Sequence, residues 1–278
     1  MKRLIDKLNQ IDGQSYKMYK QVEGVYFIEP FILVIERAQS DPFASPSNFI
    51  AKIKLENTGF SKTLYDNENK KIALSDYLIR KFEKEVALYK NNIEGTGTSG
   101  IINIPRTNKL IYKRSTCRVS ETEIEIRFES GLPSLGRNIR GRQAKKLISE
   151  NIIELLKKVL FAENNDIEAL ENHIYSYDRY SQIKQYLSNN GYIAFIAEGS
   201  KLSSNSGSVP FKTPEQGLIE IKTDYGTFKG MGIKKGITFI TGEEFNGKTT
   251  FLDTLSEGMY GHLPDSAKEL IVSRSEER

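Results

Sequence analysis

The chain has 278 residues, enough for one large domain or for two smaller ones. Hydrophobic residues make up 38% and charged residues 27%, which favours a packed core over disorder. The 40 Lys and Arg against 36 Asp and Glu leave a net charge of +4, too small to indicate nucleic-acid binding unless the charges cluster. A single cysteine, Cys117, excludes an intrachain disulfide and a thiolate metal cluster. With no signal-peptide pattern and no apolar run of membrane-spanning length, the sequence predicts a soluble cytoplasmic protein without a membrane partner.

Helix and strand patterns alternate in the first part of the chain. Apolar spacing predicts helix over residues 1–23, with a break at Asp12 and Gly13. Residues 25–35 are strand-like, and Pro30 either divides them into two strands or bends one strand. A further amphipathic helix is predicted over residues 75–90.

The clearest strand pattern lies at residues 121–129, where apolar Ile124, Ile126 and Phe128 alternate with charged side chains. We expect this strand to pair with residues 109–119. The patterns that follow predict a helix at about 143–161, a second helix over 166–189 and a buried strand over 192–197.

A Ser-Ser-Asn-Ser-Gly-Ser segment at residues 203–208 is the best linker candidate. We therefore expect an N-terminal α+β domain over 1–202, a linker over 203–210 and a second domain over 211–278. The fold class predicted for the whole chain is α/β.

Residues Gly242 to Thr249 match G-x-x-x-x-G-K-[ST], the phosphate-binding P-loop or Walker A motif. Its glycines let successive backbone N–H groups turn toward a phosphate. Lys248 would place its charge on the β- and γ-phosphates, and the Thr249 hydroxyl would ligate Mg²⁺. A strand expected at 237–241 and a helix expected at 250–255 supply the flanks that the motif requires, which favours a P-loop over a glycine turn with an exposed lysine.

The motif predicts ATP and Mg²⁺ as cofactors, with Thr249 as the metal ligand. The residues predicted to bind the nucleotide surround the bend of the loop and the first turn of its helix. They are Gly242, Asn246, Gly247, Lys248, Thr249 and Thr250.

Segments spread along nearly the whole chain resemble the predicted ATPases of the ABC class, a family with its own N-terminal domain ahead of an ABC-type core. The matching segments include Ile11-Asp12-Gly13, Asp41 to Ser47, Gly95 to Gly100, Glu125 to Phe128 with Gly131-Leu132-Pro133, Gly141 to Ala144, Ala194 to Ala197, Val209-Pro210-Phe211, Gly230 to Ile233, and His262 to Pro264. The resemblance implies an α+β N-terminal domain followed by the start of an ABC-type P-loop NTPase core.

Two departures from the family pattern bear on activity. Glu243 and Glu244 stand where the family has small glycines, and two carboxylates beside a triphosphate should weaken its binding. The resemblance also places the ABC signature and the acidic Walker B strand after position 278. The expectation is a truncated ATPase that binds ATP without hydrolysing it alone, unless a second chain supplies the missing half of the core.

A basic stretch offers a different function. Five positive charges fall within ten residues, and no acidic residue lies between Glu129 and Glu150. A solvated helix start is the common explanation for such a run. The alternative is a nucleic-acid-binding module, in which glycines at 136 and 141 let an RNA or DNA backbone approach closely. The residues concerned are Arg137, Arg140, Arg142, Lys145 and Lys146.

Overall fold

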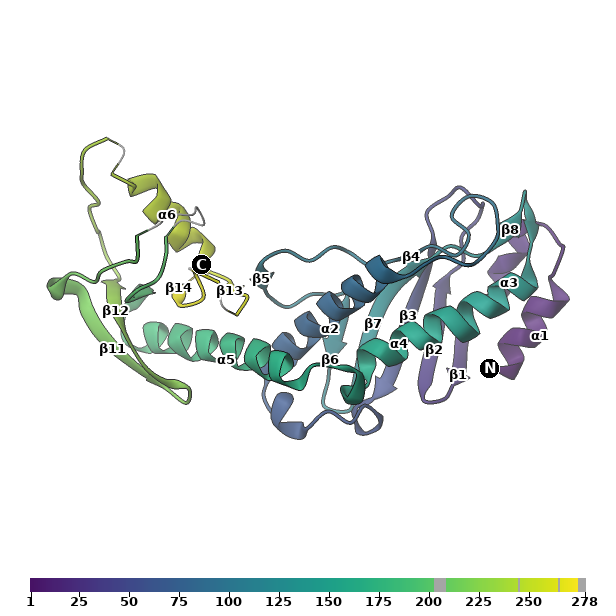
Figure 1. Cartoon of the computed structure of the whole chain (residues 1–278), viewed down its shortest axis with the longest axis horizontal. Helices are drawn as coiled ribbons and strands as arrows, with labels where there is room; N and C mark the ends of the chain where they lie inside the picture. The colour runs from purple at the N-terminus through teal and green to yellow at the C-terminus, as the bar shows by residue number, and fades with distance from the viewer. Residues whose placement is uncertain (203–208, 245, 265, 275–278) are drawn as a thin grey trace. The chain divides into compact units, whose positions relative to one another are not determined.

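In the computed structural model, residues 1–202, 209–244, 246–264 and 266–274 are described (Figure 1). The chain forms two compact units. The first consists of Met1–Asp66, Leu74–Thr107 and Lys113–Ile167, and the second of Asn67–Ala73, Asn108–Tyr112 and Glu168–Arg278. Residues 203–208 of the predicted linker lie outside the described residues, so the domain division expected at 203–210 stays a prediction.

The first unit is built on an antiparallel sheet in the order β1-β2-β3-β7-β4, with β6 also paired to β7. Its strands are β1 (Gly24–Ile28), β2 (Phe31–Arg37), β3 (Ser47–Lys54), β4 (Ile102–Asn103), β6 (Cys117–Val119) and β7 (Glu123–Ser130), and a separate hairpin joins β8 (Ser134–Leu135) to β9 (Asn138–Ile139). Its helical segments are α1 (Lys2–Gln10), η1 (Tyr16–Val22), η2 (Leu55–Asn57), η3 (Lys62–Leu64), α3 (Gly141–Lys146), η4 (Leu147–Ile152), α4 (Ile153–Leu160), η5 (Ala162–Asn164) and the greater part of α2 (Glu68–Leu88).

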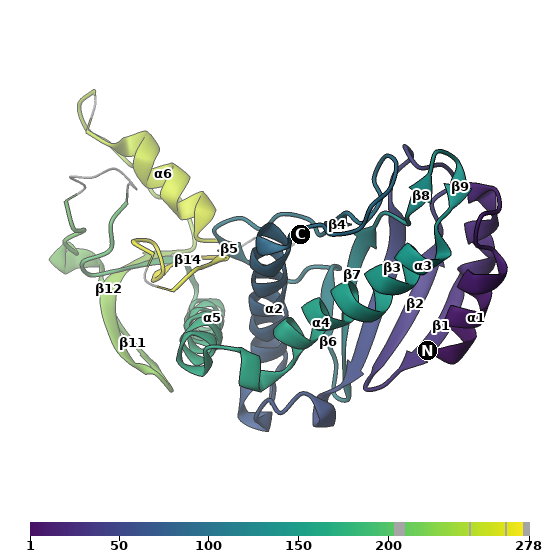
Figure 2. The same ribbon diagram turned by 45° about the vertical axis from the view of Figure 1, so that its right-hand side comes forward.

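Helices α2 and α4 lie against one face of this sheet (Figure 2). Period-2 alternation on the strands supplies the buried side chains of that face. The Phe82 ring on α2 lies 5.5 Å from the Phe128 ring on β7, and Phe128 stacks on Phe49 of β3 at the same centroid distance. The core of the first unit therefore lies between the sheet and these two helices.

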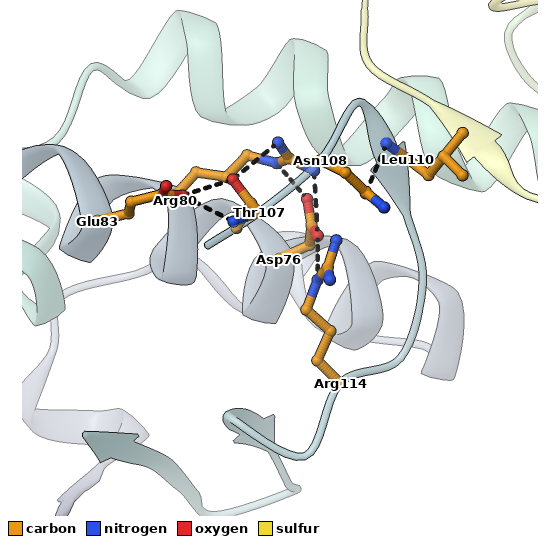
Figure 3. A network of polar contacts seen from close by, with 7 residues as sticks. All are labelled: Asp76, Arg80, Glu83, Thr107, Asn108, Leu110 and Arg114. Atoms are coloured by element: carbon orange, nitrogen blue, oxygen red, sulfur yellow. Dashed lines mark hydrogen bonds and ion pairs between the residues drawn. The ribbon is translucent and has the colours of Figure 1, made fainter. Parts of the chain in front are cut away.

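A buried carboxylate, Asp76 on α2, links the helix to the chain beyond β4 and β5 (Figure 3). Its oxygens accept hydrogen bonds from Arg80 Nε at 2.6 Å and from Arg114 Nε at 3.1 Å. Arg80 also donates to Thr107 Oγ1 at 3.3 Å, and Thr107 donates through its hydroxyl to Glu83 Oε2 at 2.6 Å. Burial works against ionisation of Glu83, yet these Thr107 hydrogen bonds and nearby arginines outweigh it and lower the Glu83 pKa.

The second unit contains a four-stranded antiparallel sheet in the order β11-β12-β10-β14. Its elements are β5 (Leu110–Ile111), α5 (Ile167–Asn189, from Glu168 on), β10 (Tyr192–Ala197), η6 (Glu215–Gly217), β11 (Leu218–Thr223), β12 (Gly226–Lys234), α6 (Lys248–Glu257), β13 (Gly261–His262) and β14 (Ile271–Ser273). Helix α5 packs on the sheet through Ile183 and Leu187, which share a core with Phe195 and Val272. Strand β5 pairs with β13 and not with the sheet of the first unit.

The predicted α/β class is confirmed, since both units combine helices with sheets. One pairing expectation was wrong in part: within residues 109–119, Cys117–Val119 pairs with β7, whereas Leu110 and Ile111 pair with residues 261–262. Across the described ranges, the chain has no helix with the length and apolar character needed to cross a membrane.

Candidate nucleotide-binding site

The P-loop follows β12 and extends into the first turn of α6, in the second unit. The strand expected before it is absent, because residues 237–241 belong to no strand. The side chains of Ile237 and Phe239 are 87% and 86% exposed. An apolar β pattern forms a strand only where a neighbouring strand accepts its backbone hydrogen bonds, and the sheet in the described residues ends at β11 and β14.

Helix α6 begins where the motif predicts, at Lys248, with Gly247 as its N-cap. Gly247 has φ +76°, a left-handed conformation that glycine adopts without strain. No side chain caps the first turn of the helix, so the amides of Lys248, Thr249 and Thr250 are left for another acceptor. These amides and the helix dipole form the kind of anion site found at helix N-termini.

The rest of α6 is fixed to the sheet. Its buried Thr254 donates a hydrogen bond shared between Leu202 O and Thr250 O, each at 2.7 Å. At its end, Gly258 O accepts a hydrogen bond from Ser273 N of β14 at 2.8 Å. The loop therefore ends on a helix held by the sheet, which gives the first turn a defined direction.

Lys248 points back into the loop. Its ammonium donates to Gly242 O at 2.7 Å and to Glu243 O at 2.6 Å. The lysine charge is thus held against two carbonyl groups of the loop backbone, on the loop whose motif binds phosphate oxygens. Glu243 and Glu244 are both exposed, so neither carboxylate occupies the interior of the loop.

A cavity of about 770 Å³ adjoins the loop, and its lining includes Asn246, Gly247, Lys248 and Thr250. The lining also contains a group of apolar residues, here called the apolar wall. They are Phe211, Met231, Ile233, Phe239, Ile240 and Phe251. Thr249 is exposed in the first turn of α6. Gly242 lies at the start of the loop, where a Cβ added to it would lie 3.8 Å from Asn246 Cβ.

These donors fit a phosphate group and its metal ion. The ammonium of Lys248 and the first-turn amides supply positive potential and hydrogen bonds, and the exposed Thr249 hydroxyl is a neutral oxygen ligand of the kind that Mg²⁺ accepts. The apolar wall offers the environment in which ligand pockets bury an organic group.

Sequence reasoning missed the apolar wall. Isolated Phe, Met and Ile residues usually belong to the hydrophobic core, so nothing in the sequence marked these residues as part of a binding site. Two of the segments that carried the family resemblance, Val209 to Phe211 and Gly230 to Ile233, supply Phe211, Met231 and Ile233 to the cavity. The family resemblance of these two segments was the only signal available from the sequence, and it did not indicate that they line a cavity.

The basic stretch lies in the other compact unit. Arg137 is exposed and its Nε lies 3.2 Å from Asp41 Oδ2, and Arg140 NH1 lies 3.4 Å from Glu94 Oε2. The three remaining members are on α3. Of these, Arg142 and Lys145 are exposed and Lys146 is half-buried.

Sequence models of two family domains match this chain. The N-terminal domain of ATPases of the ABC class matches residues 1–163, and the P-loop domain of the same ATPases matches residues 166–278. The chain therefore belongs to the ABC-class ATPase family, as the resemblance predicted. A curated relative, an uncharacterized protein MJ1628 of Methanocaldococcus jannaschii, is 35% identical over 100 residues. That match covers 30% of this chain and 22% of the relative.

Proposed function

We propose that this chain binds ATP together with Mg²⁺ at the P-loop, Gly242 to Thr249. The observation that carries the proposal is the position of Lys248, whose ammonium lies inside the loop at the uncapped N-terminus of α6. Phosphate oxygens would replace the loop carbonyls as partners of Lys248 and accept hydrogen bonds from the first-turn amides. Thr249 would hold Mg²⁺ through its hydroxyl, and Gly242, Asn246, Gly247 and Thr250 would shape the loop around the phosphates.

The decisive variant is Lys248→Ala. We expect it to abolish ATP binding measured by calorimetry, because it removes the charge that faces the β- and γ-phosphates, while far-ultraviolet circular dichroism stays unchanged. Lys222→Ala is the matched control, since Lys222 is an exposed lysine of the same unit on β11, outside the cavity lining. Undiminished affinity in Lys248→Ala would refute the assignment of the loop.

The proposal covers binding and does not extend to hydrolysis by this chain alone. Phosphoryl transfer to water needs a carboxylate that holds the magnesium ion in place and orients the attacking water. The residues proposed here supply a hydroxyl, an ammonium and backbone amides, and none of these performs that role.

A second chain is proposed as a partner of the P-loop unit. Residues 237–241 combine a β-type sequence with exposed Ile237 and Phe239 side chains and pair with no strand in the described part of the chain. The strands that precede P-loops ordinarily lie inside parallel sheets covered on both faces. Strands contributed by another chain would supply those neighbours.

Nucleic-acid binding by Arg137 to Lys146 is a second candidate function. Ion pairs with Asp41 and Glu94 partly neutralise Arg137 and Arg140, whereas no acidic side chain in the described ranges lies within ion-pair distance of Arg142, Lys145 or Lys146. Under this hypothesis, binding would fall steeply with salt and would not depend on ATP.

A further inference from the structure

The basic stretch has a neighbour that is distant in sequence. Residues 13–16 run beside residues 137–139, with Tyr16 N donating to Arg137 O at 2.8 Å and Ile139 N donating to Gln14 O at 2.8 Å. An isolated β-bridge between Ser15 and Asn138 lies in the middle of this contact. The start of η1 is thereby held directly against the start of the basic stretch.

Helix η1 presents two lysines on its outer side. It is a 3₁₀ helix, so residues three apart lie on one face. Tyr16, Tyr19 and Val22 are buried on the inner face, and the Tyr16 and Tyr19 hydroxyls donate to Leu132 O and Pro133 O. Lys17 and Lys20 are both exposed. The period of three that buries the tyrosines therefore places these two lysines together in solvent.

The start of α3, the helix that carries three of the basic residues, lies against α1. Gly141 begins α3, and a Cβ at this position would lie 2.4 Å from Leu8 O of α1, so only glycine permits this approach. Gly141 N also donates to Asp12 Oδ1 at 2.6 Å, which uses one of the nearby carboxylates. Along α3, Lys145 and Lys146 follow Arg142 by three and four residues, so these three residues lie on one side of the helix. Ala144 is buried.

An exposed aromatic residue, Phe43, is linked through Asp41 to Arg137. Asp41 binds Arg137 through one oxygen at 3.2 Å and the backbone N–H of Phe43 through the other at 3.1 Å, so Phe43 and Arg137 are held by the same carboxylate. The Phe43 side chain is 69% exposed. An aromatic ring beside cationic side chains is the combination that binds single strands, because any base can stack on the ring.

We propose that this basic surface binds the phosphate backbone of single-stranded nucleic acid and that Phe43 stacks on a base. The basic surface is defined as Lys17, Lys20, Arg137, Arg142, Lys145 and Lys146. The inference rests on the second candidate function and extends it, since it adds η1 and an aromatic contact that the basic stretch alone does not contain. Apart from Arg137, no member of the surface lies within ion-pair distance of an acidic side chain in the described ranges.

The test measures fluorescence anisotropy of a labelled single-stranded oligonucleotide of mixed sequence, titrated with the full chain at several salt concentrations. We expect Lys17→Gln with Lys20→Gln to weaken binding, and to make the slope of log affinity against log salt shallower by roughly 1.4, because two fewer phosphates are neutralised. We expect Phe43→Ala to weaken binding about fivefold or more without changing that slope. Lys62→Gln with Lys84→Gln is the matched control, because both are exposed lysines of the same unit away from the basic surface.

Three results would overturn the inference, and they are distinguishable. If Arg142→Gln with Lys145→Gln weakens binding but the η1 pair and Phe43→Ala behave as the control does, the second candidate function survives and the inference fails. If the unaltered chain binds no oligonucleotide, both fail. If poly-glutamate competes as well as the oligonucleotide, the surface takes acidic polypeptides instead of nucleic acid. Lys248→Ala should leave oligonucleotide affinity unchanged, which separates this site from the P-loop.

Discussion

Glu243 and Glu244 place two negative charges in a loop whose proposed ligand is itself an anion. Both side chains are exposed, so water screens their repulsion without removing it. We expect Glu243→Gly with Glu244→Gly to tighten ATP binding by up to about fivefold in calorimetry. Glu243→Gln with Glu244→Gln is the control, since it removes the charges without adding glycine flexibility, and it should tighten binding similarly. Weaker binding in both variants would mean that a glutamate supports the loop.

Among individual residues, Lys248, Thr249 and the loop glycines could be proposed as site residues from the sequence, because their motif has a fixed spacing and a fixed chemistry. The partners of Lys248 could not, since Gly242 O and Glu243 O are backbone atoms and carry no sequence signal. The setting of Lys17 and Lys20 could not be predicted either. The start of their helix, η1, is bonded to residues 137–139, more than a hundred residues further along the chain, and no local sequence pattern encodes that contact.

At the scale of elements, amphipathic patterns gave the correct type and near-correct bounds for β7 and α5, whereas α2 begins seven residues before the helix predicted over 75–90. The strand predicted at 121–129 is β7 at Glu123–Ser130, and the helix predicted over 166–189 is α5 at Ile167–Asn189. Pairing partners were less predictable. Residues 110–111 read locally as a strand next to β7, but their hydrogen bonds go to β13, because pairing is decided by tertiary contacts that a local pattern does not encode.

The segment after β5 is held on α2 by the buried Asp76 carboxylate, and this attachment can be tested. Asp76→Asn removes the negative charge that Arg80 and Arg114 share, and these two side chains are 19% and 12% exposed. We expect a loss of about 3 kcal/mol in the free energy of unfolding, measured by urea denaturation.

Glu154→Gln is the control for the Asp76 experiment. It breaks the Lys157–Glu154 ion pair, whose side chains are 44% and 60% exposed, and it should change stability by no more than about 0.5 kcal/mol. If Asp76→Asn lowers the free energy of unfolding by no more than this control does, the network of Figure 3 does not stabilise the first unit.

For the whole molecule, the exposed apolar segment at 237–241 is the feature most relevant to behaviour in solution. Ile237 and Phe239 lie two residues apart and are each more than four-fifths exposed, on backbone that pairs with no strand among the described residues, and this combination favours association. We expect Ile237→Lys with Phe239→Lys to reduce concentration-dependent self-association in analytical ultracentrifugation. Leu88→Lys, which replaces a single apolar side chain that is 66% exposed, should have little effect. Equal association of all three proteins would argue against a partner surface at this segment.

The two proposed ligand sites belong to different compact units, the P-loop to the second and the basic surface to the first. Each can therefore be altered by substitutions within its own unit. The family assignment extends over both units, and the sequence predicted it because matching segments are distributed along nearly the whole chain.

The inward orientation of Lys248 has a kinetic consequence. If the loop binds phosphate as proposed, the Lys248 ammonium must first release Gly242 O and Glu243 O, so phosphate would enter only in the fraction of molecules in which those bonds have opened. The apparent dissociation constant is then the intrinsic one divided by that fraction. Association is correspondingly slower than collision with an already open loop. A substitution that favours the open form would therefore raise the association rate constant while leaving the contacts of the bound state intact.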